Sequence, residues 1–230
     1  MAEPTPKNVP ATTTTPPTNP PTEPAAATPA KGPHPPVSDP DRELVSRCQR
    51  KHPGAFEELV RKYQDRVFNL CFRFLRERET SEEIAQDVFV AVYKHIEGFK
   101  GDSKFSTWLF RVVANHCHNK SKYLRRRRHK LQDSLDAPIE GEDGDMKREL
   151  PDDPDRSPEE LAQRHGLNGL IQRAIGELDD DHRVIVLLRD VEDMSYEEIG
   201  EILGLPEGTV KSRLHRARNE LRAKLSKTPV

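Results

Sequence analysis

The chain has 230 residues, of which only 33% are hydrophobic, a proportion that favours small helical domains over a single large core. Its net charge is −2, yet ten Lys or Arg face one acid in residues 100–130, and seven face two acids in residues 206–227. Residues 131–166 between them hold twelve acids against four bases. Two basic stretches flanking an acidic one predict two separate surfaces for a polyanion.

Membrane and secretory classes are not expected from this sequence. No apolar run is long enough to cross a bilayer, and the start lacks the basic and apolar regions of a secretory signal. Cys48, Cys71 and Cys117 are irregularly spaced, so each is read as a small buried hydrophobe rather than part of a disulfide framework. We therefore expect a soluble cytoplasmic protein.

Residues 1–37 form a Pro/Thr-rich tail that holds twelve of the twenty prolines and almost no large apolar side chain. Such a composition cannot bury enough surface to offset the entropy of ordering the chain, so we expect a disordered tail. It can be a spacer or an interaction segment, and the spacer is the simpler interpretation.

Residues 38–130 carry the apolar spacing of several packed helices. His52-Pro53-Gly54 breaks one helix, and a long core-facing helix is expected from Ala55 to Leu75. Thr80 and Glu83 suggest a capping box for the next helix, with Tyr93 among its inward-facing positions. A Gly-containing loop at residues 98–103 then leads into a further helix.

That further helix carries an unusual polar face. Trp108, Arg111, Asn115 and Asn119 fall within about 80° of arc, and Lys120, Lys122 and residues 125–128 add positive charge after them. An aromatic ring beside guanidinium and amide groups can stack on an unpaired base and hydrogen-bond its edge. The alternative is that Trp108 is a core aromatic and the arginines are a solvated helix end. A metal site at His116-Cys117-His118 is disfavoured, because adjacent helical side chains diverge by about 100°.

Residues 131–156 read as an acidic, self-repelling flexible linker, because five Pro and Gly residues interrupt any regular element. Residues 157–230 then predict a compact four-helix unit. Its first helix starts at Ser157-Pro158 and runs through Leu178, and Asp180 and Asp181 cap the second.

The last two helices form a helix-turn-helix. Ser195 and Glu198 make a capping box, Gly204 permits a tight helix stop, Leu205 can fill the space between the helices, and Pro206 suits the first turn of the next helix. An apolar stripe on that helix leaves Lys211, Ser212, His215 and Arg216 on the other arc, where they suit phosphates and base edges in a major groove. An amphipathic helix whose solvated side happens to be basic remains the alternative.

With these residues in place, the chain resembles the extracytoplasmic-function group of bacterial sigma factors, the promoter-recognition subunits of RNA polymerase. The resemblance runs from about Asp39 to Leu225 and rests on three motifs in the expected order. They are EEIAQDVFVAVY at Glu82–Tyr93, FKGDSKFSTWLFRVVANHCHN at Phe99–Asn119, and SYEEIGEILGLPEGTVKSRLHRAR at Ser195–Arg218.

The resemblance implies an all-α protein of two small helical domains joined by the acidic linker, with core RNA polymerase and promoter DNA, duplex and melted, as partners. It implies no chemistry of its own, no cofactor, no metal and no small-molecule substrate, and an anti-sigma protein, often membrane-bound, as inhibitor. Polymerase docking is expected at Glu83, Gln86, Asp87 and Phe89. The minus-ten element is expected to meet Gly101, Asp102, Ser103, Lys104, Phe105, Trp108, Arg111, Asn115 and Asn119, and the minus-thirty-five element Lys211, Ser212, Arg213, His215 and Arg216.

Two other classes of function compete with this one. An ordinary helix-turn-helix regulator would bind duplex operators as a dimer and use the first domain as a sensor, but a sensor has no need of a single-strand reader. A nucleic-acid-processing enzyme would use His116, Cys117 and His118.

Overall fold

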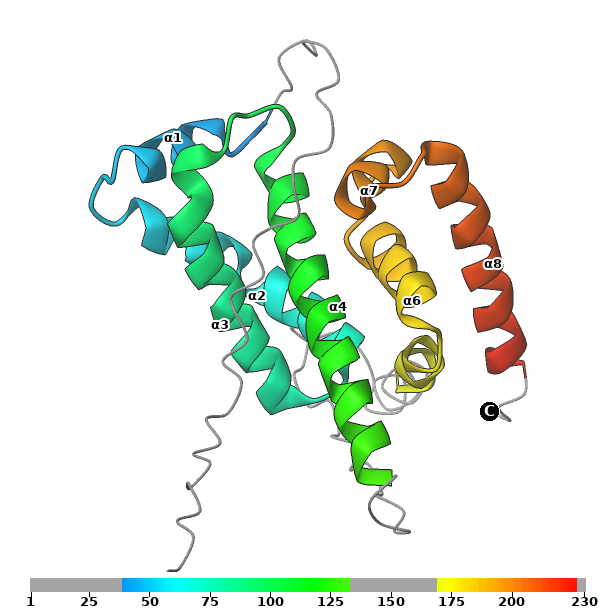
Figure 1. Ribbon diagram of the computed structural model, residues 1–230. Coiled ribbons are helices and arrows are strands. Elements are labelled where there is room, and N and C mark those ends of the chain that lie inside the picture. Colours follow the sequence, from blue (N-terminus) through cyan, green and yellow to red (C-terminus); the bar gives the residue numbers. More distant parts are fainter. Residues whose placement is uncertain (1–38, 133–168, 227–230) are drawn as a thin grey trace, which may run out of the picture. The chain divides into compact units, whose positions relative to one another are not determined.

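A computed structural model describes residues 39–132 and 169–226, and in these ranges the secondary structure is helical without strands. The predicted tail lies outside the described residues, as does nearly all of the predicted acidic linker. No helix in the described ranges combines the length and the apolar character needed to span a bilayer. The elements are α1 Arg42–Gln49, α2 Ala55–Leu75, α3 Arg78–His95, η1 Ile96–Gly98, α4 Phe105–Gln132, α6 Asp180–Val186, η2 Leu187–Val191, α7 Tyr196–Leu203 and α8 Glu207–Leu225 (Figure 1).

The N-terminal helical part, α1 to α4, is built around the long α2, which packs on α1, α3 and α4. Gly54 precedes α2 with a φ of 77°, a left-handed conformation that glycine adopts without steric cost, so the predicted break before Ala55 is confirmed. Aromatic and aliphatic side chains at helical spacing fill the space between the helices. The three cysteines are free and buried, as the sequence predicts, and the Cys71 and Cys117 sulfurs lie 3.7 Å apart in this core.

Two details of α3 differ from the prediction. The helix starts at Arg78 after Glu77, so Thr80 lies inside the first turn, where its hydroxyl donates to the Glu77 carboxylate at 2.5 Å. The predicted Thr80–Glu83 capping box is therefore wrong, because the helix begins three residues earlier, with Glu77 rather than Thr80 as its N-cap. Tyr93 is 63% exposed rather than inward-facing, and its ring meets Phe56 edge-on at 4.9 Å.

The C-terminal helical part comprises a helix over residues 169–176 followed by α6, η2, α7 and α8, which confirms the predicted run of four helical segments. Its start at Ser157 lies outside the described residues. Asp179, not Asp180 or Asp181, is the N-cap of α6 and accepts a hydrogen bond from the His182 amide at 2.8 Å. The second segment ends in a π-helical stretch, η2, that the apolar spacing did not predict.

The two helical parts contact each other, α4 packing on α6 and α7 while α2 packs on α6 and η2. Buried side chains from both parts belong to one apolar cluster. Apolar spacing within each segment carries no information about this packing, because the partners are far apart in sequence.

Candidate nucleic-acid interface

The loop before α4 is anchored to the core at its last residue. The Phe105 amide donates to the Asp39 carboxylate at 2.8 Å, and the Phe105 ring is fully buried, 5.6 Å from the ring of Tyr63. Gly101 takes a φ of 77°, which lets the loop turn sharply. Phe105 thus supports the loop from beneath and is not itself open to a base, while Gly101 and Asp102 are exposed and Ser103 and Lys104 are half-buried.

Trp108 and Arg111 form the inner edge of the polar face on α4, and both are half-buried. The indole packs on Phe99 at 5.5 Å and on Phe105 at 5.7 Å between ring centroids, so much of its area serves the core. The Nε atom of Arg111 is buried and has no hydrogen-bond partner among the described residues. An unsatisfied buried donor of this kind costs about 1–3 kcal/mol.

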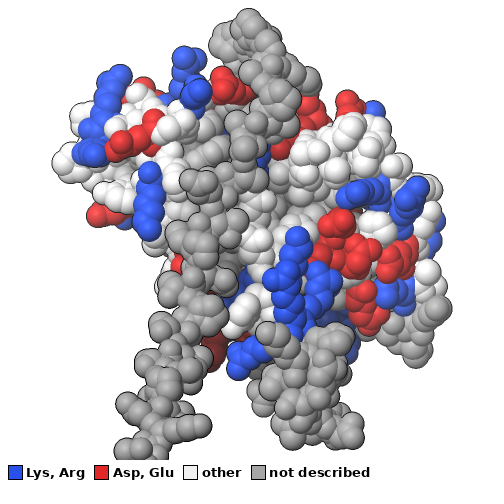
Figure 2. All heavy atoms as spheres, viewed as in Figure 1, with Lys and Arg blue, Asp and Glu red and all other residues white. Residues whose placement is uncertain are grey.

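Asn115 and Asn119 form the outer edge of the same face and are exposed. They lie on α4 with Trp108 and Arg111, as the spacing predicts. Towards the end of the helix, residues 125–128 are all exposed arginines, and in Figure 2 basic groups gather beside this half of α4. The helix therefore presents amides near its middle and positive charge towards its end.

The turn between α7 and α8 has the predicted helix-turn-helix chemistry. The Ser195 hydroxyl accepts from the Glu198 amide at 3.1 Å, and the Glu198 carboxylate accepts from the Ser195 amide at 2.8 Å, which confirms the capping box. Gly204 ends α7 with a φ of 66°. A Cβ at Gly200 would lie 2.7 Å from the Leu205 carbonyl oxygen, so the close return of the turn requires glycine there. Pro206 is the N-cap of α8 rather than its first residue.

On α8 the buried stripe of Val210, Leu214 and Ala217 faces the fold, so the opposite arc is free. Lys211, Ser212, His215 and Arg216 are exposed on that arc, in the positions predicted for a recognition face. Lys211 pairs with Glu207 at 2.6 Å, which raises the pKa of its ammonium. Arg213 differs from the other four, because it is half-buried and turns towards Asp181 of α6 at 3.4 Å.

The residues predicted to dock on polymerase lie on α3. Glu83, Gln86 and Asp87 are exposed, whereas Phe89 is half-buried. The sequence reasoning missed Val90, which is 52% exposed, and it turned Tyr93 inward. The sequence spacing could have placed both residues on the exposed face. Gln86, Val90 and Tyr93 are spaced i, i+4, i+7, so they share one side of the helix.

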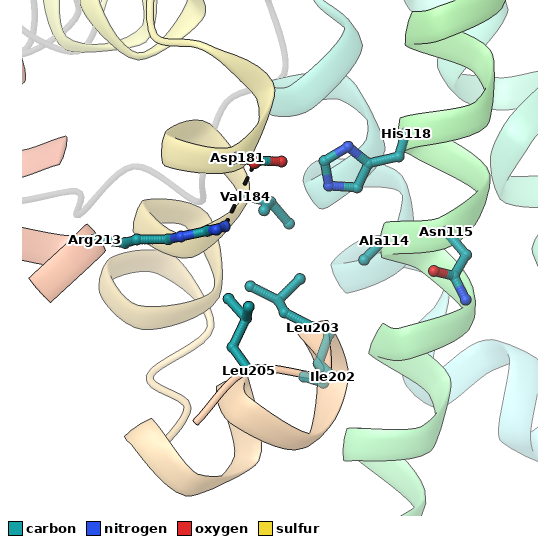
Figure 3. Close-up of a pocket in the computed structure, with 9 residues that line it drawn as sticks. All are labelled: Ala114, Asn115, His118, Asp181, Val184, Ile202, Leu203, Leu205 and Arg213. Atoms are coloured by element: carbon teal, nitrogen blue, oxygen red, sulfur yellow. Dashed lines mark hydrogen bonds and ion pairs between the residues drawn. The ribbon is translucent and has the colours of Figure 1, made fainter. Parts of the chain in front are cut away.

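A small cavity of about 140 Å³ lies where α4 meets α6, α7 and α8. In Figure 3, Ala114 and His118 face it from α4, and Arg213 and Asp181 meet on the other side. Asn115 is at the edge of the lining, with its amide turned away from the other residues drawn. Burial lowers the pKa of His118, although Asp180 and Asp181 oppose this effect. One predicted minus-ten residue, Asn115, and one predicted minus-thirty-five residue, Arg213, therefore line the same cavity from opposite sides.

The His116-Cys117-His118 triplet does not converge on one point. Cys117 is buried against Cys71, while the His118 ring packs edge-on against Phe74 at 5.2 Å. Within the described ranges, Asp179, His182 and Glu220 do converge, with possible ligand atoms all within 4.8 Å. His182 Nδ1 already lies 3.0 Å from the Asp179 carboxylate and 3.1 Å from the Glu220 carboxylate. Lys224 lies 3.9 Å from Glu220, and a nearby ammonium opposes a metal cation.

Family models match both helical parts. The model described as "Sigma-70 region 2" matches residues 59–130, and that described as "Sigma-70, region 4" matches residues 168–221. The chain is 35% identical over 185 residues to the ECF RNA polymerase sigma factor SigW of Bacillus subtilis, across 80% of this chain and 96% of that protein. It is also 35% identical to the RNA polymerase sigma-H factor of Pseudomonas aeruginosa, across 80% of this chain and 93% of that one.

The chain belongs to the extracytoplasmic-function sigma factors. It is a promoter-recognising subunit of transcription initiation, in a family of regulatory DNA-binding proteins. The chain matches both region 2 and region 4. An ordinary helix-turn-helix regulator would match the helix-turn-helix region without region 2.

Solved structures agree with the fold. CnrH, in its complex with the cytosolic domain of CnrY, superposes with a TM-score of 0.58 at 23% identity, across 82% of this chain and 99% of that one. The sigma factor RpoE of Bartonella quintana, in its complex with the anti-sigma factor NepR, gives 0.57 at 22% identity, across 76% and 99%. At these identities the likeness concerns the fold alone.

Proposed function

We propose that the polar face of α4 and the loop before it hold the melted minus-ten strand of the promoter. The observation that carries this assignment is the arrangement of exposed Asn115 and Asn119 beside half-buried Trp108 and Arg111, next to a loop anchored at Phe105. The amides and the guanidinium provide donors for a base edge, and the exposed indole edge provides an apolar wall. Gly101, Asp102, Ser103 and Lys104 complete the rim of this surface.

The exposed arc of α8 reads the duplex minus-thirty-five element in this proposal. Lys211 and Arg216 supply charge for phosphates, while Ser212 and His215 can approach base edges. Arg213 is the weakest member of the set, because its guanidinium faces Asp181 and must leave that partner to reach DNA.

The face of α3 that bears Glu83, Gln86 and Asp87 docks on core polymerase in this proposal, with Phe89 behind it. Exposed Val90 and Tyr93 extend the face and provide apolar area, which aromatic residues commonly supply at the centre of an interface. The protein then acts in the cytoplasm without catalysing a reaction itself. An anti-sigma protein is its expected inhibitor, since related structures are complexes with such proteins.

Run-off transcription with purified core polymerase on a promoter-fragment library, with and without this chain, tests the assignment as a whole. Specific transcripts should appear only with the chain. Polymerase docking is tested separately by Tyr93→Ala, which should weaken association with core polymerase. Tyr123→Ala, at a similarly exposed tyrosine on α4, should not. Equal association by both variants would remove α3 from the docking surface.

A further inference from the structure

The short helix α1 contacts both ends of the loop before α4. At the start of the loop, the Gln49 side-chain amide donates to the Ile96 carbonyl oxygen at 3.0 Å and to the Phe99 carbonyl oxygen at 2.8 Å. At the end of the loop, the Asp39 carboxylate accepts from the Phe105 amide at 2.8 Å. Gln49 is the last residue of α1 and Asp39 precedes its first turn, so the two contacts come from opposite ends of one helix. This helix lies beside the segment that joins α3 to α4 (Figure 1).

Asp39 supplies a helix cap that the local sequence lacks. The first amides of a helix have no partner within the helix, and Lys104, the residue before α4, has no acceptor in its side chain. The Asp39 carboxylate accepts from the first amide of α4 across 66 positions of sequence, and a negative charge at this end of a helix is favourable. Its other oxygen accepts from the Asp41 amide at 3.0 Å. Asp39 therefore joins the start of α1 to the start of α4.

The helix α1 is itself fixed to α2. The Asp41 carboxylate is buried and accepts from the Tyr63 hydroxyl and the Lys62 ammonium, both on α2. Because α1 is a regular helix of eight residues, it keeps the contacts of Gln49 and Asp39 at a constant separation. The distance between the two ends of the loop is therefore set by a rigid element and not by the loop itself.

The same two ends support the indole of the polar face. The rings of Phe99 and Phe105 lie 5.9 Å apart, and Trp108 packs on both, at 5.5 Å and 5.7 Å between ring centroids. Between these ends, Gly101 and Asp102 are exposed. A shift of either end would displace both the exposed part of the loop and the indole.

We propose that Gln49 and Asp39 are positioning residues for promoter recognition, which hold the loop before α4 in the geometry that reads a base of the melted minus-ten strand. This role rests on the proposed minus-ten surface and adds two residues that act through the loop rather than on DNA. A recognition site must be held within about 0.5 Å of its productive geometry, and a loop with free ends loses entropy when it orders on its ligand. Loss of either contact therefore lowers discrimination between bases at the minus-ten element and leaves the minus-thirty-five element unaffected.

The first experiment tests the two contacts in the free full-length chain. Hydrogen–deuterium exchange, followed by mass spectrometry, reports on peptides that contain the Phe99 and Phe105 amides, both of which are hydrogen-bonded. Exchange in these peptides should be about three- to tenfold faster in Gln49→Met and in Asp39→Ala, because one end of the loop is released in each. Peptides from the middle of α2 should exchange as in the wild type.

Gln64→Met is the matched control, since it makes the same change at an exposed glutamine of α2. It should leave exchange in the loop unchanged. Wild-type exchange of the loop in both Gln49→Met and Asp39→Ala would overturn the proposal. Equal acceleration throughout the N-terminal helical part would also overturn it, because α1 would then stabilise the fold in general.

The second experiment measures base discrimination by the holoenzyme. A promoter from the run-off library is compared with single-base changes in each of its two elements, on templates already mismatched across the minus-ten region so that melting does not contribute. The readout is the ratio of the two affinities, because loss of folded protein lowers both affinities equally. Gln49→Met and Asp39→Ala should each lower the minus-ten ratio about three- to tenfold and change the minus-thirty-five ratio less than about twofold.

A conservative variant separates the hydrogen bond from the side chain that makes it. Asp39→Asn keeps an oxygen that can accept from the Phe105 amide, so it should retain more of the minus-ten ratio than Asp39→Ala. Gln64→Met should retain all of it. Unchanged ratios in both Gln49→Met and Asp39→Ala, or equal losses at the two promoter elements, would overturn the positioning role.

Asn115→Ala and Asp102→Ala in the same assay separate this role from the function on which it rests. If either variant lowers the minus-ten ratio while Gln49→Met and Asp39→Ala do not, the minus-ten surface stands and the positioning role fails. If none of the four lowers the ratio, the minus-ten assignment itself fails, and the positioning role fails with it.

Discussion

Arg183 of α6 is joined to the end of α2 through Phe74. Its Nη1 atom donates to the Phe74 carbonyl oxygen at 2.8 Å, and its guanidinium lies 5.3 Å from the centre of the Phe74 ring. Its Nη2 atom donates to Gly176 at 2.6 Å and to Leu178 at 2.7 Å. One guanidinium therefore satisfies carbonyls at the ends of two helices, one from each helical part.

Arg183→Met should lower the free energy of unfolding by about 2–4 kcal/mol, because partly buried carbonyls lose their donor while the aliphatic volume is kept. Chemical denaturation monitored by circular dichroism measures the change. Arg222→Met, at an exposed position on α8, should stay within about 0.5 kcal/mol of the wild type. Similar losses in both variants would mean that the Arg183 contacts contribute little.

The helix-turn-helix depends on its capping box. Ser195→Ala removes the hydroxyl that accepts from the Glu198 amide and should cost about 1 kcal/mol of stability. Ser195→Asp keeps an acceptor at the same place and should restore most of the loss. If the alanine and aspartate variants are equally destabilised, the hydrogen-bond acceptor at position 195 does not stabilise the start of α7.

Local chemistry made much of the fold predictable from sequence. The break at Gly54, the capping box at Ser195 and the stop at Gly204 each depend on neighbouring residues, and all three are confirmed. The error at Thr80 is also local, since Glu77 accepts the threonine hydroxyl within the first turn, an arrangement that the pattern Ser/Thr-x-x-Glu does not distinguish.

The packing of the two helical parts could not be predicted in the same way. The pair between Lys104 and Glu198 joins residues 94 positions apart, and neither residue departs from the expected solvated pattern of its own segment. Arg213 shows that prediction from spacing is also limited within one helix. Its position beside the recognition arc does not reveal that Asp181 of α6 faces it. Periodicity assigns a side of a helix, but the partner on that side comes from tertiary structure.

Stability should depend on pH through two half-buried imidazoles. Burial lowers the pKa of both His116 and His118 from the ordinary value of 6.5. The unfolded chain therefore takes up protons first, so their contribution is complete above pH 6.5 and is lost as the pH falls through the lower folded values.

Urea unfolding at constant ionic strength, from pH 7.5 downwards, tests this dependence. The free energy of unfolding should decline below about pH 6.5 in the wild type. His116→Gln/His118→Gln should show a shallower decline over the same range. A double variant with the wild-type slope would assign the dependence to other groups.

On the recognition helix, Arg216→Ala should weaken binding to the upstream element and leave assembly with core polymerase unchanged. Loss of one phosphate contact should reduce the salt dependence by about one unit, and loss of a bidentate base contact should remove about 1–3 kcal/mol of discrimination at one base. Lys211→Ala should have the smaller effect, since Glu207 already holds that ammonium. Competition binding of the holoenzyme to duplex promoters measures both, with Arg222→Ala as the exposed control on α8.

The central claim is that the polar face of α4 holds the opened strand, and Asn115→Ala tests it most directly. Permanganate reactivity of unpaired thymines should fall strongly on duplex promoters bound by the variant holoenzyme, and should recover on templates already mismatched across the minus-ten region. Asn69→Ala, at an exposed asparagine of α2, should open promoters like the wild type. Wild-type reactivity with Asn115→Ala on duplex promoters would contradict the assignment and return this face to an ordinary solvated surface.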